Sequence, residues 1–211
     1  MGEQNSKQNE PYDRKKRIKN EENKSEKIQK DFNKMLEDPR FSLEECYHSA
    51  ILKGNYDNKL NSLKQMDETE DKFSKNINLN DYRNNDGTFN IYKTKRPLNC
   101  KVGEQLNNLS KKAHHEGIAI GNEKNILFSD YGVKDNHLAV RFWDSKENKD
   151  NWSVVEKVGV SNASDKEIMD IFFGEKSENW INPNNYNLLL HNCQDYSKEI
   201  INQLIKIQKN P

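Results

Sequence analysis

The fold of this chain is organised around residues 186–196, which read YNLLLHNCQDY. The segment is apolar up to Leu190 and then places the polar Asn192 directly before Cys193. Beyond the cysteine, the residues recur with the spacing of one helix face at Ser197, Ile200, Ile201, Leu204 and Ile205. We therefore predict an amphipathic helix with Cys193 in its first turn and Asn192 as its N-cap.

A thiol in the first turn of a helix is well placed for nucleophilic chemistry. The positive end of the helix dipole favours the thiolate, which is the form that attacks a carbonyl carbon. The backbone N–H of Cys193 is a natural oxyanion donor there, and the side chain of Asn192 or Gln194 could add a second. The alternative interpretation is a small buried side chain, because free cysteine is among the most buried residue types.

A second segment, HHEGIAIG at residues 114–121, favours chemistry over burial. It places a histidine doublet at the start of a short alternating strand that Gly121 ends. A histidine at a strand edge and a cysteine at a helix N-terminus are the two parts of a thiolate–imidazolium pair. We therefore expect the two segments to meet in space although they are far apart in sequence.

In this order, the two motifs resemble those of the circularly permuted papain-like hydrolases. The pattern His-x-Gly-Ile-x-Ile-Gly, followed much later by Tyr-Asn-Leu-Leu-x-x-Asn-Cys-x-x-Tyr, is similar to PPPDE-type peptidases and to lecithin:retinol acyltransferase-like enzymes. Both groups are relatives of the NlpC-type amidases. The resemblance covers about residues 86–207 and implies that His115 is the base and Cys193 the nucleophile, 78 residues later.

The resemblance implies a cysteine peptidase that uses a Cys–His dyad and needs no cofactor or metal. Its substrate would be an amide or isopeptide bond in a protein or a ubiquitin-like conjugate. Two alternatives share the fold: an acyltransferase or lipid hydrolase of the lecithin:retinol acyltransferase type, and a binding module that has lost catalysis. A third alternative is an enzyme with the motif order of papain, in which Cys100 is the nucleophile.

A residue that orients His115 would complete the site. The acyltransferase-like relatives carry a second histidine on the following strand, and this chain has Leu127 at the nearest position. Ser129 and Asp130, two and three residues later, are the candidates for this role. The absence of the second histidine favours the peptidase-like branch.

Composition limits the remaining function classes. Hydrophobic and charged residues each make up 32% of the 211 residues, and the mean hydropathy is −1.16. An ordinary globular protein is closer to half apolar, so part of the chain should be solvated helix or disorder. The 34 basic and 34 acidic residues cancel, which gives no support for a nucleic-acid partner. Three cysteines without CxxC spacing favour a reducing compartment over disulfides or structural zinc.

The chain divides into three regions in this interpretation. Residues 1–22 are expected to be a disordered polar and basic tail, residues 23–85 a charged helical region, and residues 86–211 the catalytic domain. The turn sequence NNDG at residues 84–87 marks the boundary. The class predicted is α+β, with a small antiparallel sheet and helices packed on it.

The N-terminus has two interpretations. Gly2 lies in the pattern M-G-x-x-x-[ST] for N-myristoylation, and a basic cluster follows it, so residues 2–19 could contact a membrane surface. The other interpretation is a solvated tail. The sequence has no apolar run of membrane-spanning length and no signal peptide, so we expect a cytoplasmic protein, or one delivered into a host cytoplasm. We expect a monomer, because no long heptad repeat is present.

Local patterns predict the individual elements. The N-terminal helices are expected at about residues 23–36, ended by Pro39, then from the capping box at Ser42 to Gly54, then at residues 58–73. Strands are expected at residues 89–92, 115–121, 126–130, 138–143 and 152–158, with a hairpin joining the second and third. Arg96 and Pro97 should break the first strand, and helices should cover residues 102–112 and 164–174.

Overall fold

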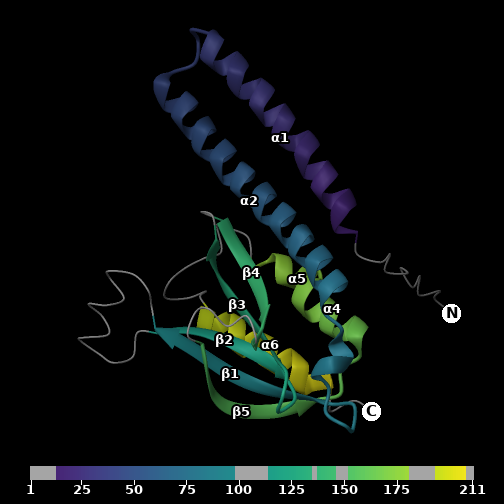
Figure 1. Ribbon diagram of the computed structural model, residues 1–211. Coiled ribbons are helices and arrows are strands. Elements are labelled where there is room, and N and C mark those ends of the chain that lie inside the picture. Colours follow the sequence, from purple (N-terminus) through teal and green to yellow (C-terminus); the bar gives the residue numbers. More distant parts are fainter. Residues whose placement is uncertain (1–12, 98–113, 135–136, 146–151, 181–192, 208–211) are drawn as a thin grey trace, which may run out of the picture.

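The structure is a computed structural model that describes residues 13–97, 114–134, 137–145, 152–180 and 193–207. A long antiparallel arm of two helices, α1 (Arg14–Glu37) and α2 (Leu43–Asn76), extends from a domain built on a five-stranded antiparallel sheet (Figure 1). A short 3₁₀ turn, η1 (Leu79–Tyr82), connects the arm to the sheet. The predicted α+β class is confirmed.

Helix α1 begins earlier than the sequence patterns indicated. Asp13 is its N-cap and accepts a hydrogen bond from the backbone N–H of Lys16 at 3.0 Å. The assignment of residues 14–22 to a disordered tail is therefore wrong. This polar segment is helical because one of its sides pairs with α2, for example through the ion pair between Glu22 and Lys64 at 2.6 Å.

Helix α2 is one continuous helix of 34 residues. The capping box at Ser42 and Glu45 is confirmed, but the predicted break at Gly54 is wrong. A glycine inside a helix costs only about 1 kcal/mol relative to alanine, and contacts with α1 along the arm offset that cost. The tip of the arm exposes several large apolar side chains: Leu36, Phe41, Leu43, Tyr47, Ile51 and Leu52.

A buried cluster of charges fastens the base of the arm to the domain. Arg14 is only 4% exposed, and its Nε lies 3.2 Å from Glu178 Oε1. The same guanidinium also contacts the carboxylate of Glu70 and the carbonyl of Phe173. Arg17 adds a second ion pair to Glu178, at 2.6 Å. The basic residues at the start of α1 thus hold the arm against α4 (Asp165–Phe173) and α5 (Glu175–Glu178).

The sheet has the strand order β4-β3-β2-β1-β5, with every neighbouring pair antiparallel. The predicted hairpin between the second and third strands is confirmed. The first strand extends past the predicted residues 89–92 and ends at Pro97, where the sequence predicts a break; at a strand end the missing N–H of proline costs little. The strands are β1 (Phe89–Pro97), β2 (His114–Gly121), β3 (Ile126–Lys134), β4 (His137–Asp144) and β5 (Ser153–Ser161).

Apolar clusters cover both faces of the sheet around β2. On one face, α6 (Cys193–Ile207) packs Tyr196, Ile200 and Leu204 onto a core that includes Ile118 and Ile120. On the other face, Ala119, Phe128 and Trp152 form a smaller cluster with partly buried aromatic neighbours. Because side chains alternate along a strand, residues 115, 117 and 119 belong to this second face. The predicted helix at residues 102–112 lies outside the described residues.

Candidate active site

Helix α6 begins at Cys193, as the sequence predicts. Tyr196, three residues after Cys193, holds the start of the helix in position. It is fully buried and hydrogen-bonded to Ser129 on β3 at 3.1 Å. Cys193 itself is partly exposed. In Figure 1, α6 starts near the end of the sheet where β1 ends and β2 begins, so its first residue and the histidine doublet lie at the same end of the sheet.

His115 joins the thiol to the sheet. Its Nε2 lies 2.7 Å from Asp130 Oδ2, and the neighbouring Cys193 raises the pKa of the ring. The neighbouring His114 pairs instead with Glu116, at 2.9 Å. Of the two histidines, the structure therefore places the one at position 115 beside the cysteine.

Asp130 is a fully buried carboxylate with two cationic partners. Arg141 Nε donates to Oδ1 at 2.8 Å, and a second guanidinium nitrogen contacts Oδ2, which also faces His115. Burial raises the pKa of Asp130, but the hydrogen bonds and charges of His115 and Arg141 outweigh it and hold the pKa below its usual value. Asp130 therefore stays ionised beside the imidazole.

The surroundings of His115 favour the imidazolium. Burial lowers the pKa of His115, but hydrogen bonds to Asp130 and Cys193, together with the negative charge those groups carry, raise it to about 9. An imidazole that is protonated at neutral pH, lies beside a thiol and is hydrogen-bonded to a carboxylate has the arrangement of a Cys–His–Asp triad.

Trp152 and Gly117 fix the position of the imidazole. The ring centroids of His115 and Trp152 are 5.5 Å apart, and the rings meet edge to face at 60°. A Cβ on Gly117 would lie 3.0 Å from Trp152 Cη2 and 2.8 Å from the carbonyl oxygen of Ser129. Only glycine leaves room for the indole there, which gives the His-x-Gly spacing a physical reason.

The structure places the other candidate residues in different environments. Ser129 faces α6 and bonds to Tyr196, so Asp130 is the candidate that contacts His115. Leu127 is buried in the core under α6, and the side chain of Gln194 is exposed on α6. Cys46 belongs to the arm, where its Sγ lies 3.9 Å from the Met35 carbonyl. Three predictions lie outside the described residues: those for Gly2, Cys100 and Asn192.

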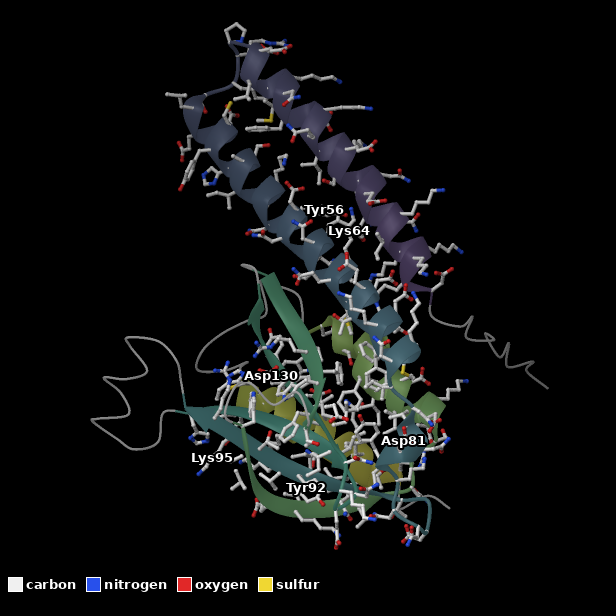
Figure 2. The ribbon with its side chains drawn as sticks, in the orientation of Figure 1. Tyr56, Lys64, Asp81, Tyr92, Lys95 and Asp130 are labelled. Carbon is white, nitrogen blue, oxygen red and sulfur yellow. The ribbon has the colours of Figure 1, made fainter. Side chains whose placement is uncertain are left out.

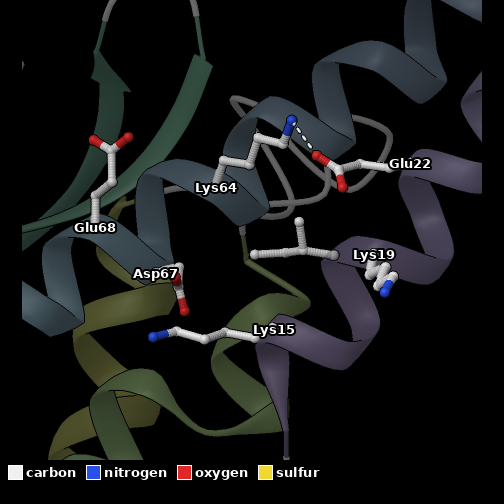
Figure 3. A pocket seen from close by; sticks show the side chains of 7 residues that line it. Lys15, Lys19, Glu22, Lys64, Asp67 and Glu68 are labelled. Atoms are coloured by element: carbon white, nitrogen blue, oxygen red, sulfur yellow. Dashed lines mark ion pairs between the residues drawn. The ribbon is translucent and has the colours of Figure 1, made fainter.

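The arm contains a pocket of about 370 Å³ between α1 and α2 (Figure 3). Its lining is almost entirely charged, with both signs, and includes the Lys64–Glu22 ion pair. All its lining residues come from the two arm helices, so it is separate from His115 and Cys193. Within the described ranges, no group of three or more His, Cys, Asp and Glu side chains is arranged to hold a metal ion.

No helix in the described part of the chain combines the length and the apolar character needed to cross a bilayer. Comparison with known proteins gives no match to a family model, a curated protein or a solved structure. The interpretation of the site therefore rests on the geometry around His115.

Sequence reasoning missed three residues of this site. Arg141 and Trp152 fall in predicted strands, and Arg96 was interpreted only as part of a strand break. Their roles depend on strand register, which pairs Arg141 with Asp130 and Arg96 with His115. An isolated charged residue within an apolar strand, such as Arg141 in HLAVRFWD, is the one local signal that could have indicated a buried partner.

Proposed function

We propose that this protein is a cysteine hydrolase that cleaves an amide or isopeptide bond in a protein substrate. The observation that supports this most strongly is the double engagement of His115, with Cys193 on one side and Asp130 on the other. A buried structural cysteine needs no such partners. The partial exposure of Cys193 is consistent with access by a substrate.

The reaction begins when the Cys193 thiolate attacks the carbonyl carbon and the carbonyl π electrons move to oxygen. The backbone N–H of Cys193, at the first residue of α6, is the donor best placed for that oxyanion. As the C–N bond breaks, His115 gives its proton to the departing nitrogen. This leaves a thioester on Cys193 and releases an amine.

Hydrolysis then restores the enzyme. Neutral His115 takes a proton from water, the hydroxyl oxygen attacks the thioester carbon, and the C–S bond breaks to return the thiolate. The net reaction consumes one amide and one water and yields one acid and one amine. Asp130 orients the imidazole and stabilises its protonated form throughout, as the carboxylate does in other triads.

The peptidase branch is favoured over the acyltransferase branch by the residue that orients His115. The position at which acyltransferase-like enzymes present a second histidine is occupied by Leu127, which packs in the core. A carboxylate from the same strand, Asp130, holds the imidazole instead.

The test compares wild type with Cys193→Ala on two substrate sets. One set contains ubiquitin-like isopeptide conjugates, and the other contains phospholipid vesicles. We expect the wild type to cleave conjugates and the variant to be inactive, with no acyl product from the vesicles in either case. Equal product from both proteins would refute the proposal. If the wild type acts on the phospholipid vesicles and not on the conjugates, the protein is an acyltransferase or lipid hydrolase instead.

A further inference from the structure

Arg96 lies beside the catalytic histidine, and no carboxylate in the described part of the chain pairs with its charge. It is paired with His115 across β1 and β2, and directly opposed residues in an antiparallel pair point to the same face. Its Cζ lies 5.4 Å from the centroid of the Trp152 ring, which also meets His115 edge to face. The guanidinium, the indole and the imidazole therefore form one continuous surface.

The other charges of the site cancel in pairs. Asp130 is balanced by Arg141, and in the thiolate–imidazolium pair of the proposed mechanism His115 is balanced by Cys193. Among the described residues, Arg96 has neither a carboxylate partner nor a hydrogen-bond partner for its buried Nε. Leaving a partly buried guanidinium unpaired is costly unless a ligand completes its interactions.

We propose that Arg96 is the anion-binding subsite of this enzyme and selects peptide substrates with a carboxylate side chain next to the scissile bond. The inference rests on the proposed function and adds a substrate class to it. Arg96 is suited to this role because its planar fork of donors matches a carboxylate, while the cation–π contact with Trp152 helps to hold the guanidinium beside the imidazole.

Two alkylating reagents test the charge of the subsite without knowledge of the natural substrate. Iodoacetate and iodoacetamide have nearly the same size and attach to sulfur with loss of iodide, but only iodoacetate is an anion. We define the selectivity ratio as the rate of Cys193 alkylation by iodoacetate divided by the rate by iodoacetamide. Mass spectrometry of the full-length protein measures both rates.

We expect Arg96→Gln to lower the selectivity ratio by about three- to tenfold, the effect of removing one positive charge beside the imidazole that neighbours the thiol, at an intermediate dielectric constant. Arg96→Lys should keep most of the ratio, because it keeps the charge. Lys95→Gln is the matched control: Lys95 is exposed on the opposite face of the same strand, at the end of the sheet that also contains Asp130 (Figure 2). It removes one charge from the other face of the strand and should lower the ratio much less than Arg96→Gln does.

An unchanged ratio in Arg96→Gln, or an equal fall in Lys95→Gln, would overturn the proposal. A purely structural role of Arg96 would slow both reagents alike and leave the ratio constant. The ratio is measurable even when labelling is slow, so the test of Arg96 does not depend on whether the protein is a hydrolase. If Cys193 reacts no faster than Cys46 with either reagent, the hydrolase proposal fails, while the ratio still reports on Arg96.

Discussion

At the scale of single residues, His115 is the point where the sheet and the last helix meet. Its ring contacts the Asp130 carboxylate from β3 and the indole of Trp152, the residue directly before β5. It also neighbours Cys193, the first residue of α6. Each contact restricts a different freedom of the ring: the carboxylate fixes its tilt and tautomer, and the indole limits its rotation. In the proposed mechanism, an imidazole held in this way needs little reorganisation when the thiol reacts.

The raised pKa of His115 makes stability depend on pH. The pKa is about 9 in the folded protein and 6.5 in the unfolded chain, so the folded state binds the proton more tightly. The stabilisation is complete below pH 6.5 and is lost as the pH rises through 9. We expect the free energy of unfolding to fall by about 1–3 kcal/mol over this window, as measured by urea denaturation.

His115→Gln is the control for that measurement, because glutamine does not titrate. The fall between pH 6.5 and 9 should be clearly smaller in this variant. If the wild type and the variant show parallel curves, His115 does not have the raised pKa that its contacts imply.

Gly117 gives a second prediction at the residue scale. A methyl group there would collide with the Trp152 ring and the Ser129 carbonyl, so Gly117→Ala should displace the indole that positions His115. We expect a loss of about 1–3 kcal/mol in the free energy of unfolding, the usual cost of overpacking. We also expect slower alkylation of Cys193.

Gly132→Ala is the matched control for Gly117→Ala. Its Cβ would meet its nearest neighbours, on Arg141 and His115, at 3.5–3.6 Å, which is ordinary van der Waals contact. This variant should retain most of its stability. Equal losses at the two glycines would show that the Trp152 contact is not what requires Gly117.

At the scale of elements, the arm shows where local sequence patterns are and are not sufficient. The capping boxes at Ser42 and Ser164 predicted the starts of α2 and α4 correctly, because a cap is a local hydrogen-bond pattern. The start of α1 and the continuity of α2 past Gly54 were missed. Both depend on contacts between the two helices, which a pattern read within one helix does not contain.

The buried arginine at the base of the arm gives a prediction at this scale. Arg14→Ala removes the cation that contacts Glu178, Glu70 and the Phe173 carbonyl, and leaves buried acceptors without it. Breaking a buried ion pair in this way costs roughly 3–5 kcal/mol, less here because Arg17 still reaches Glu178. We expect a clear fall in the free energy of unfolding, measured by chemical denaturation.

Arg40 at the tip of the arm provides the comparison. Its side chain is 87% exposed and pairs with Asp38 at 2.6 Å, and an ion pair of such an exposed arginine contributes little. Arg40→Ala should therefore be close to wild type. If Arg14→Ala lowers the free energy of unfolding as little as Arg40→Ala does, the arm is not held to the domain by this cluster of charges.

At the scale of the whole molecule, the sequence predicted the two motifs of the site but not the contacts that connect them. The motifs around His115 and Cys193 could be predicted because a strand-edge histidine and a helix-start cysteine have local signatures. The roles of Asp130 and Arg141 were harder to predict, since they follow from the register of β3 against β2 and β4. Register is set by packing across the sheet, as is the pairing of β5 with β1 at its edge.

The molecule also offers its own internal standard for the central claim. Its three cysteines lie in different settings: Cys46 in the arm, Cys100 outside the described residues, and Cys193 beside His115. One labelling reaction therefore compares the proposed nucleophile with two reference thiols under identical conditions. Folding, reagent concentration and pH are the same for all three.

The most direct measurement is the rate of iodoacetamide alkylation at each cysteine at pH 6.5, followed by peptide mass spectrometry, in wild type and His115→Gln. We predict that Cys193 reacts at least about tenfold faster than the other two thiols, because the imidazolium favours its thiolate, and that the substitution removes this advantage. If Cys193 reacts no faster than Cys46, or if its rate is the same without the imidazole, the thiol and the histidine do not act together.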